Sequence, residues 1–176
     1  MMEQHQKVYK IASTLLQYPT EEWLRGIEDI KLELKEMDDS FTKMYLNSFL
    51  FYVESTPFDE LCEKYVATFD YHGIVTLHLT YHVFKDSRKR GEALVKLRNV
   101  FNESQFETIT EELPDYLPLI LEFLSVANED QMQQVLKLHY KSMEKLHDDL
   151  MREDSEYHFI LKAINTVSEE KLKNVS

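Results

Sequence analysis

The sequence predicts an all-α protein, a single-domain bundle of about nine or ten helices. Apolar residues recur with the period of a helix along most of the chain, whereas the alternation typical of a strand is rare. The 3 Gly and 4 Pro lie almost entirely where a helix can begin, end or turn. With 176 residues, the chain is long enough for one core. We expect one domain over residues 1–166 and a frayed tail over residues 167–176.

The most apolar segment, residues 113–127, is predicted to form the central helix. Asp115 and Glu122 are its only charged residues, and its apolar residues fall on every side of the helical wheel. A helix of this kind has to be covered by other elements. Asp115 suits the N-cap position, because Pro118 then lies in the first turn, where a missing N–H costs no intrahelical hydrogen bond.

N-capping residues and a proline predict the boundaries of the first three helices. The first is expected to end before Pro19, because the residue preceding a proline is biased against helical backbone angles. Thr20 can cap the second helix, and either Asp39 or Ser40 can cap the third.

The fourth helix is predicted to begin at Thr56-Pro57, with Thr56 as the N-cap and Pro57 at the first helical position. Its end is expected near residues 70–73, where Gly73 can adopt left-handed backbone angles. Residues 75–84 begin with a β-branched stretch, but no partner strand is evident, so they are predicted to form a fifth helix.

Asp86 or Ser87 can cap a sixth helix, which contains Gly91. A short helical piece is expected over residues 105–110, before the central helix. After the central helix, Asn128 can cap a long amphipathic helix, and a final helix is expected to end near residue 166.

Composition narrows the functional classes. The single cysteine, Cys62, excludes an internal disulfide and a cysteine-rich zinc site. The first residues do not resemble a signal peptide, and no apolar run approaches the length of a membrane span, so we expect a soluble cytoplasmic protein without membrane insertion. A net charge of −12 argues against nucleic acid or anionic lipid as the main partner.

The charge is unevenly distributed along the chain. Residues 99–134 contain eight acidic residues and no Lys or Arg, while six of the 20 basic residues lie just before them, within residues 85–98. The acidic segment is interpreted either as a solvated surface or as a docking site for a basic partner.

Histidines are the candidate metal ligands, since His78 and His82 are four residues apart and would share one face of a helix. The motif of a zinc protease is absent, and so are the paired motifs of di-iron bundles. No glycine-rich phosphate loop is present either. We therefore predict no catalytic residues, no metal and no cofactor.

Two predicted loops, residues 70–73 and 112–116, combine carboxylates with aromatic side chains at helix ends. Arginine pairs with carboxylates in a bidentate manner and stacks on aromatic faces. These loops, which include His72 and Tyr116, are therefore interpreted either as a site for an arginine-containing segment or as ordinary capping and turn structure.

Three motifs together resemble the TorD/NarJ family of redox-enzyme maturation chaperones, and most closely its nitrate reductase branch. They occur in this order: YVATFD at residues 65–70, DSRxRG at residues 86–91, and ELPDYLPxxLEFL at residues 112–124. The resemblance covers residues 1–150, and its third motif is the most specific.

The resemblance implies an all-helical cytoplasmic chaperone rather than an enzyme. Its client would be the N-terminus of the nitrate reductase alpha subunit, an arginine-containing leader or its remnant. It would hold that apoenzyme competent for molybdenum cofactor insertion without joining the final complex, and molybdenum cofactor biosynthesis proteins would be further partners. The motif residues implied to bind peptide are Tyr65, Phe69, Asp70, Glu112, Pro114, Asp115, Leu117, Pro118 and Glu122.

The resulting hypothesis places the peptide in a groove formed by the fourth, fifth and central helices, with Asp70, Glu112 and Asp115 facing its arginines. Two alternatives remain at this point. One is a metal-dependent helical-bundle enzyme using His72, His78 and His82, and the other is a permanent structural subunit held in an acidic interface. The sequence also leaves open a monomer or a domain-swapped dimer.

Overall fold

The computed structural model describes residues 1–38, 40–71 and 75–174. Within these ranges the chain forms nine α-helices, and no strand longer than an isolated bridge occurs there. The helices are α1 (Gln4–Leu15), α2 (Glu21–Glu36), α3 (Phe41–Ser55), α4 (Phe58–Phe69), α5 (Leu79–Phe84), α6 (Arg88–Glu103), α7 (Leu117–Val126), α8 (Glu129–Arg152) and α9 (His158–Lys173). The predicted all-α class is therefore confirmed.

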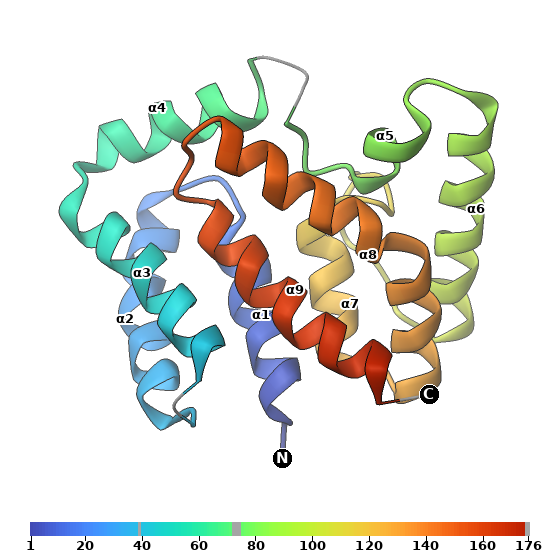
Figure 1. Cartoon of the computed structure of the whole chain (residues 1–176), viewed down its shortest axis with the longest axis horizontal. Coiled ribbons are helices and arrows are strands. Elements are labelled where there is room, and N and C mark those ends of the chain that lie inside the picture. Colours follow the sequence, from blue (N-terminus) through green and yellow to red (C-terminus); the bar gives the residue numbers. More distant parts are fainter. Residues whose placement is uncertain (39, 72–74, 175–176) are drawn as a thin grey trace.

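The α7 helix occupies the centre of the fold, as its composition predicts. Every residue of α7 is buried except Glu122 and Val126. It packs along α1, and the Ser13 hydroxyl donates a hydrogen bond to the carbonyl of Pro118 (2.6 Å). Figure 1 shows α8 and α9 crossing in front of α1 and α7, with α2, α3 and α4 on one side and α5 and α6 on the other. The remaining helices thus cover the apolar segment.

Two predicted N-caps, Thr20 and Asn128, are confirmed, and of the two candidates for the third helix Ser40 is the N-cap. The Thr20 hydroxyl accepts a hydrogen bond from the Trp23 amide, and the Ser40 hydroxyl accepts one from Lys43. Asn128 forms a capping box with Gln131 at the start of α8. Each of these side chains satisfies an amide that the first turn of a helix leaves without a partner.

The prediction for the start of α4 was wrong by one residue. Pro57 is the N-cap, and Thr56 instead closes α3, where its hydroxyl donates to the carbonyl of Tyr52 (2.7 Å). The predicted left-handed turn at Gly73 lies outside the described residues.

The fifth helix is shorter than predicted, because residues 75–78 are not helical. His78 instead pairs with Tyr116 in an isolated antiparallel bridge. The strand-like start of this segment does have a partner, but the partner is the turn that precedes α7.

The predicted helix over residues 105–110 does not form. Gln105 ends α6 with a positive φ of 54°, and the Phe106 amide bonds back to the carbonyl of Phe101. Residues 107–111 are all exposed, so this stretch has no apolar face to bury.

The last helix continues beyond its predicted end near residue 166. The α9 helix runs to Lys173, because Val167 and Ser168 are buried. The Ser168 hydroxyl also shares a hydrogen bond with the buried Tyr9 hydroxyl of α1 (3.0 Å). Among the described helices, none combines the length and apolar character that crossing a membrane requires.

Candidate functional site

The backbone at the start of α7 is tied to the segment that leads into α5. The Leu117 amide donates to the carbonyl of Leu77 (2.8 Å), and the Leu79 amide donates to the carbonyl of Asp115 (3.0 Å). These two bonds flank the His78–Tyr116 bridge. They hold residues 112–116, one of the two predicted peptide-binding loops, against the N-terminal end of α5.

Asp115 lies inside this junction and is fully buried. One carboxylate oxygen accepts hydrogen bonds from both the amide and the hydroxyl of Thr80. The other lies 3.2 Å from Nδ1 of His78. A guanidinium nitrogen of Arg90 is 3.8 Å from the carboxylate, and the Nε of Arg90 donates to the Thr80 hydroxyl (3.1 Å).

These contacts correct the prediction that Asp115 caps the central helix. Tyr116 is the N-cap of α7, and Asp115 instead accepts a hydrogen bond from an amide in the first turn of α5. Burial raises the pKa of Asp115, but hydrogen bonds from His78 and Thr80 outweigh it and hold the pKa below its ordinary value. The carboxylate is therefore charged and already paired, so it presents no free surface to an arginine.

The network also joins two of the motifs that carry the family resemblance. Arg90 comes from residues 86–91, and Asp115 comes from residues 112–124. Their meeting around Thr80 gives both motif residues a structural role at the α5–α6–α7 junction.

Next to the buried contacts of Asp115, a partly exposed cluster of side chains surrounds Tyr116. Its ring lies 5.5 Å from that of His78, whose Nε2 is 3.8 Å from the carboxylate of Glu112. Burial raises the pKa of Tyr116, a hydrogen bond with Tyr65 opposes the rise, and the nearby charges of Glu112 and Asp70 add to it. The charges of Asp70 and Glu112 thus both act on the Tyr116 side chain.

The other predicted site residues are distributed differently. Leu117, Pro118 and Pro114 are buried, and Glu122 is exposed on α7. Tyr65 and Phe69 are buried in an aromatic cluster with Tyr157, with ring centroids 4.9–5.8 Å apart. His72 lies outside the described residues.

A groove of about 990 Å³ lies between the end of α6 and residues 104–116, and we call it the acidic loop groove. Its charged lining consists of Glu107, Glu111 and Glu112, with Arg98 as the one basic residue. Its apolar and aromatic lining consists of Phe101, Phe106, Pro114 and Leu119.

Of these lining residues, only Glu112 and Pro114 are among the peptide-binding residues predicted from the sequence. The acidic stretch after residue 99 was the signal for Glu107 and Glu111. The position of Phe101 and Phe106 in the groove depends on how α6 ends. Two further apolar residues of the same loop do not line the groove but are exposed beside it. Ile109 is fully exposed, and Leu113 is 40% exposed.

The histidines proposed as metal ligands have other partners. His78 contacts Asp115, and Nε2 of the buried His82 donates to the carbonyl of Thr76 (2.8 Å). Within the described ranges, no three His, Cys, Asp or Glu side chains are grouped so that they could hold a metal ion.

Comparison with known proteins places the chain in a family. The sequence profile of the nitrate reductase delta subunit matches residues 34–158. A Bacillus subtilis protein named as the nitrate reductase molybdenum cofactor assembly chaperone NarJ is 32% identical over 92% of this chain and 90% of its own length. An Escherichia coli protein named as the corresponding chaperone NarW is 34% identical over 74% of this chain and 54% of its own length.

The fold agrees with this relationship. A crystal structure from Archaeoglobus fulgidus, assigned as a redox enzyme maturation protein, superposes with a TM-score of 0.67 over 96% of both chains at 17% sequence identity. On the sequence evidence, the chain belongs to the nitrate reductase delta subunit family.

Proposed function

We propose that this protein is a system-specific chaperone for nitrate reductase. It binds the N-terminal region of the apo catalytic alpha subunit and keeps it competent for molybdenum cofactor insertion and assembly. It acts in the cytoplasm, is not an enzyme, and does not remain in the finished complex. The names of the relatives support the assembly role, because two of them are described as molybdenum cofactor assembly chaperones for nitrate reductase.

The acidic loop groove is the observation that carries the proposed binding site. It combines three carboxylates with two aromatic rings, which is the chemistry that arginine-containing segments need. Exposed Ile109 and Leu113 add apolar surface beside the carboxylates. Glu112 also connects the groove to the Tyr116 cluster near Asp70. A short helical leader with arginines on one face and apolar residues on the other matches this surface.

Titration calorimetry with the first 15 residues of the alpha subunit tests the site. The triple variant Glu107→Gln/Glu111→Gln/Glu112→Gln removes the carboxylates from the groove, and we expect it to weaken binding at least tenfold. The matched control Asp29→Asn/Glu36→Gln/Asp38→Asn removes the same charge from exposed positions in and just after α2, and should bind within twofold of the wild type. If both variants bound the peptide equally weakly, the effect would come from net charge and not from the groove. If neither variant bound it more weakly than the wild type, the groove would not be the binding site.

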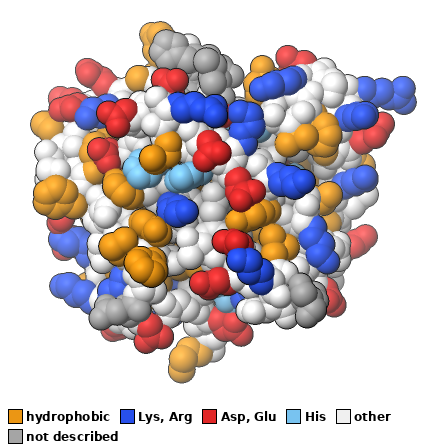
Figure 2. Space-filling model, viewed as in Figure 1, with side chains coloured by type: hydrophobic (Ala, Val, Ile, Leu, Met, Phe, Trp, Pro, Cys, Tyr) orange, Lys and Arg blue, Asp and Glu red, His pale blue; other side chains and the backbone are white. Residues whose placement is uncertain are grey.

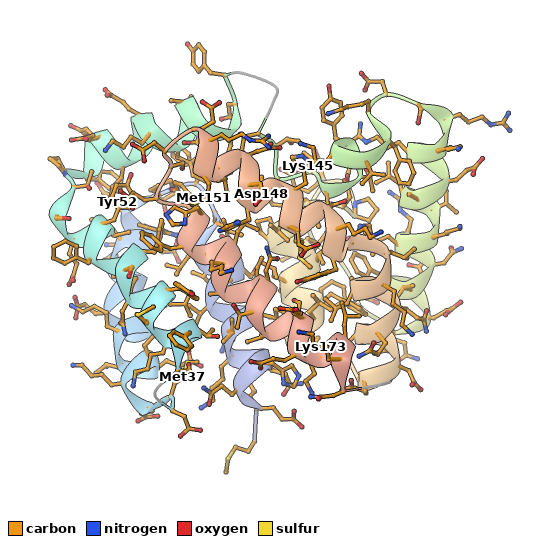
Figure 3. All side chains as sticks on the ribbon, viewed as in Figure 1. Met37, Tyr52, Lys145, Asp148, Met151 and Lys173 are labelled. Atoms are coloured by element: carbon orange, nitrogen blue, oxygen red, sulfur yellow. The ribbon has the colours of Figure 1, made fainter. Side chains whose placement is uncertain are left out.

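A second groove provides a competing location for the peptide. It has a volume of about 780 Å³, lies between α3 and the start of α9, and is lined in part by Met44, Phe51, Tyr52 and Phe159. Tyr52 marks its position in Figure 3. If Phe51→Ser abolished binding while the acidic triple variant retained it, the client site would belong here instead.

The two alternative functions have separate tests. Stoichiometric amounts of this chain in the purified, active nitrate reductase complex would indicate a structural subunit rather than an assembly chaperone. A stoichiometric metal in the purified protein, detected by elemental analysis and lost in His78→Ala, would favour the enzyme hypothesis.

A further inference from the structure

The first half of α6 extends beyond the hydrophobic core. From residue 88 to residue 96 no side chain is buried, and Val95 is 59% exposed. The buried anchors of the helix begin at Leu97 and continue with Val100 and Phe101. Figure 1 shows α6 at the edge of the molecule, where its packing partners are α5 and α8. The first half of this helix is therefore only partly covered by the rest of the chain.

A small cavity lies between this half of α6 and its two neighbours. Its volume is about 250 Å³, below the usual range for a small-molecule site. Phe84 of α5, Ala93 of α6 and Leu138 of α8 give it apolar walls, and Leu138 is 49% exposed. The buried His139 also lines it. The cavity has the size and character to receive one apolar side chain from outside.

The rim of the cavity is basic. Lys89 and Lys96 line it, Arg88 precedes them on the same helix, and all three are exposed. None of the three makes an ion pair with any residue that the structure describes, although the chain has 32 acidic residues. Glu92 is the one acidic residue on this half of α6 and also lines the cavity. Figure 2 shows Lys and Arg side chains, with acidic side chains between them, on the side of the molecule where Figure 1 places α6.

We propose that this surface binds an acidic segment of a protein partner. An apolar side chain of the segment fills the cavity between α5, α6 and α8, and neighbouring carboxylates pair with Lys89 and Lys96. This partner differs in charge from the arginine-containing client leader, so the inference goes beyond the proposed function and does not depend on it.

Charge complementarity favours a protein segment over a polyanion. The net charge of −12 repels nucleic acid and anionic membranes at long range. A patch of three cations acts within the Debye length of roughly 8 Å at physiological salt, which suits one or two carboxylates beside an apolar anchor. Such pairing contributes more to specificity and association rate than to affinity, while the anchor side chain supplies most of the binding energy.

Selection from a random 12-residue peptide library displayed on phage tests this inference with the full-length protein as target. We expect the enriched peptides to contain Asp or Glu on either side of a Leu, Phe or Met. A synthetic copy of the leading peptide should bind at least tenfold more weakly to Lys89→Gln/Lys96→Gln and to Leu138→Gln. The matched control Lys35→Gln/Lys141→Gln, which neutralises two exposed lysines elsewhere, should bind like the wild type.

Three results would overturn the inference. One is enrichment of peptides without acidic residues, and another is equal binding to the wild type and both cavity variants. The third is tight binding of phosphatidylserine vesicles or a 20-nucleotide single-stranded DNA that depends on Lys89 and Lys96, because it would identify the surface as a site for a polyanion. Binding of the cationic leader peptide to these variants, measured in parallel, keeps this test separate from that of the acidic loop groove.

Discussion

Asp115 belongs to the motif that most specifically indicates the family, and its carboxylate lies in the interior of the protein. A buried charge is tolerated only when it is paired and hydrogen-bonded, and Thr80, His78 and Arg90 meet that requirement. The motif residue therefore shapes the candidate site by holding α5 and α6 against the start of α7. In the proposed function, the carboxylates that contact the client are exposed neighbours such as Glu112.

Replacing the Asp115 carboxylate should destabilise the folded protein more than it directly affects peptide binding. We expect Asp115→Ala to lower the free energy of unfolding by about 3 kcal/mol, because it leaves the Thr80 amide and the Arg90 guanidinium without their acceptor. Urea denaturation followed by circular dichroism measures the change. Glu112→Ala, an exposed carboxylate in the same turn, is the control and should cost less than about 0.5 kcal/mol. Full stability of Asp115→Ala would contradict the structural role of the network.

Helix α5 shows how tertiary contacts complete a short element. It has six residues, far fewer than an isolated helix needs in water. Its own N-cap, His78, makes no capping hydrogen bond with its side chain, and the Asp115 carboxylate supplies the acceptor from a different part of the chain. The helix is thus stabilised from outside itself.

Helix α6 contains a glycine, Gly91, that the packing around it does not require. A Cβ added at Gly91 would meet nothing within 4 Å, so close packing does not require the missing side chain. Glycine inside a helix costs about 1 kcal/mol relative to alanine, and Gly91→Ala should raise the free energy of unfolding by about that amount. Thermal and urea denaturation measure the gain. Gly26→Ala in α2, where a Cβ also meets nothing, should behave in the same way, and a loss of stability in either variant would contradict the open geometry.

The stability of the whole molecule should depend on pH through its buried histidines. His139 of α8 is 3% exposed, and burial lowers its pKa from 6.5 to about 4, although the charge of Asp115 acts in the opposite direction. Burial also lowers the pKa of His82. The folded protein keeps these side chains neutral, while the unfolded chain takes up protons near pH 6.5. The resulting stability is present above pH 6.5 and is lost as the pH falls toward 4.

The expected loss for His139 alone is about 2 kcal/mol between pH 7 and pH 5. Urea denaturation at both pH values should show that the free energy of unfolding falls less for His139→Leu than for the wild type. His82 should account for part of the pH dependence that remains in this variant. His147→Gln, which replaces a histidine outside the core on the same helix, should keep the wild-type difference. An unchanged pH dependence in His139→Leu would show that this side chain is not held neutral by the fold.

Charge is also segregated across the molecule. The acidic stretch after residue 99 forms the loop groove, and the basic stretch before it forms the exposed half of α6. One net-negative protein therefore offers two surfaces of opposite character. A chaperone that engages a cationic leader and an acidic partner in turn would need this separation.

Local sequence information was sufficient where an element depends on its own residues. The caps at Thr20, Ser40 and Asn128 satisfy amides three residues away, so the sequence identified each of them as a candidate. The apolar residues of α7 required a central position whatever surrounds them. Predictions for residues 75–78 and 105–110 were wrong, because those segments are decided by a backbone bridge to Tyr116 and by a left-handed residue at Gln105.

The sequence by itself therefore determined the all-helical class, the central helix, most helix boundaries and the uneven charge of this protein. Only the tertiary structure decided which carboxylates are buried and which are available to a partner. The reason is physical: Asp115 bonds to Thr80, 35 residues away in the chain, and Glu107 lines the same groove as Phe101 of α6. Burial and pairing of a charge depend on such distant neighbours, and local spacing does not specify them.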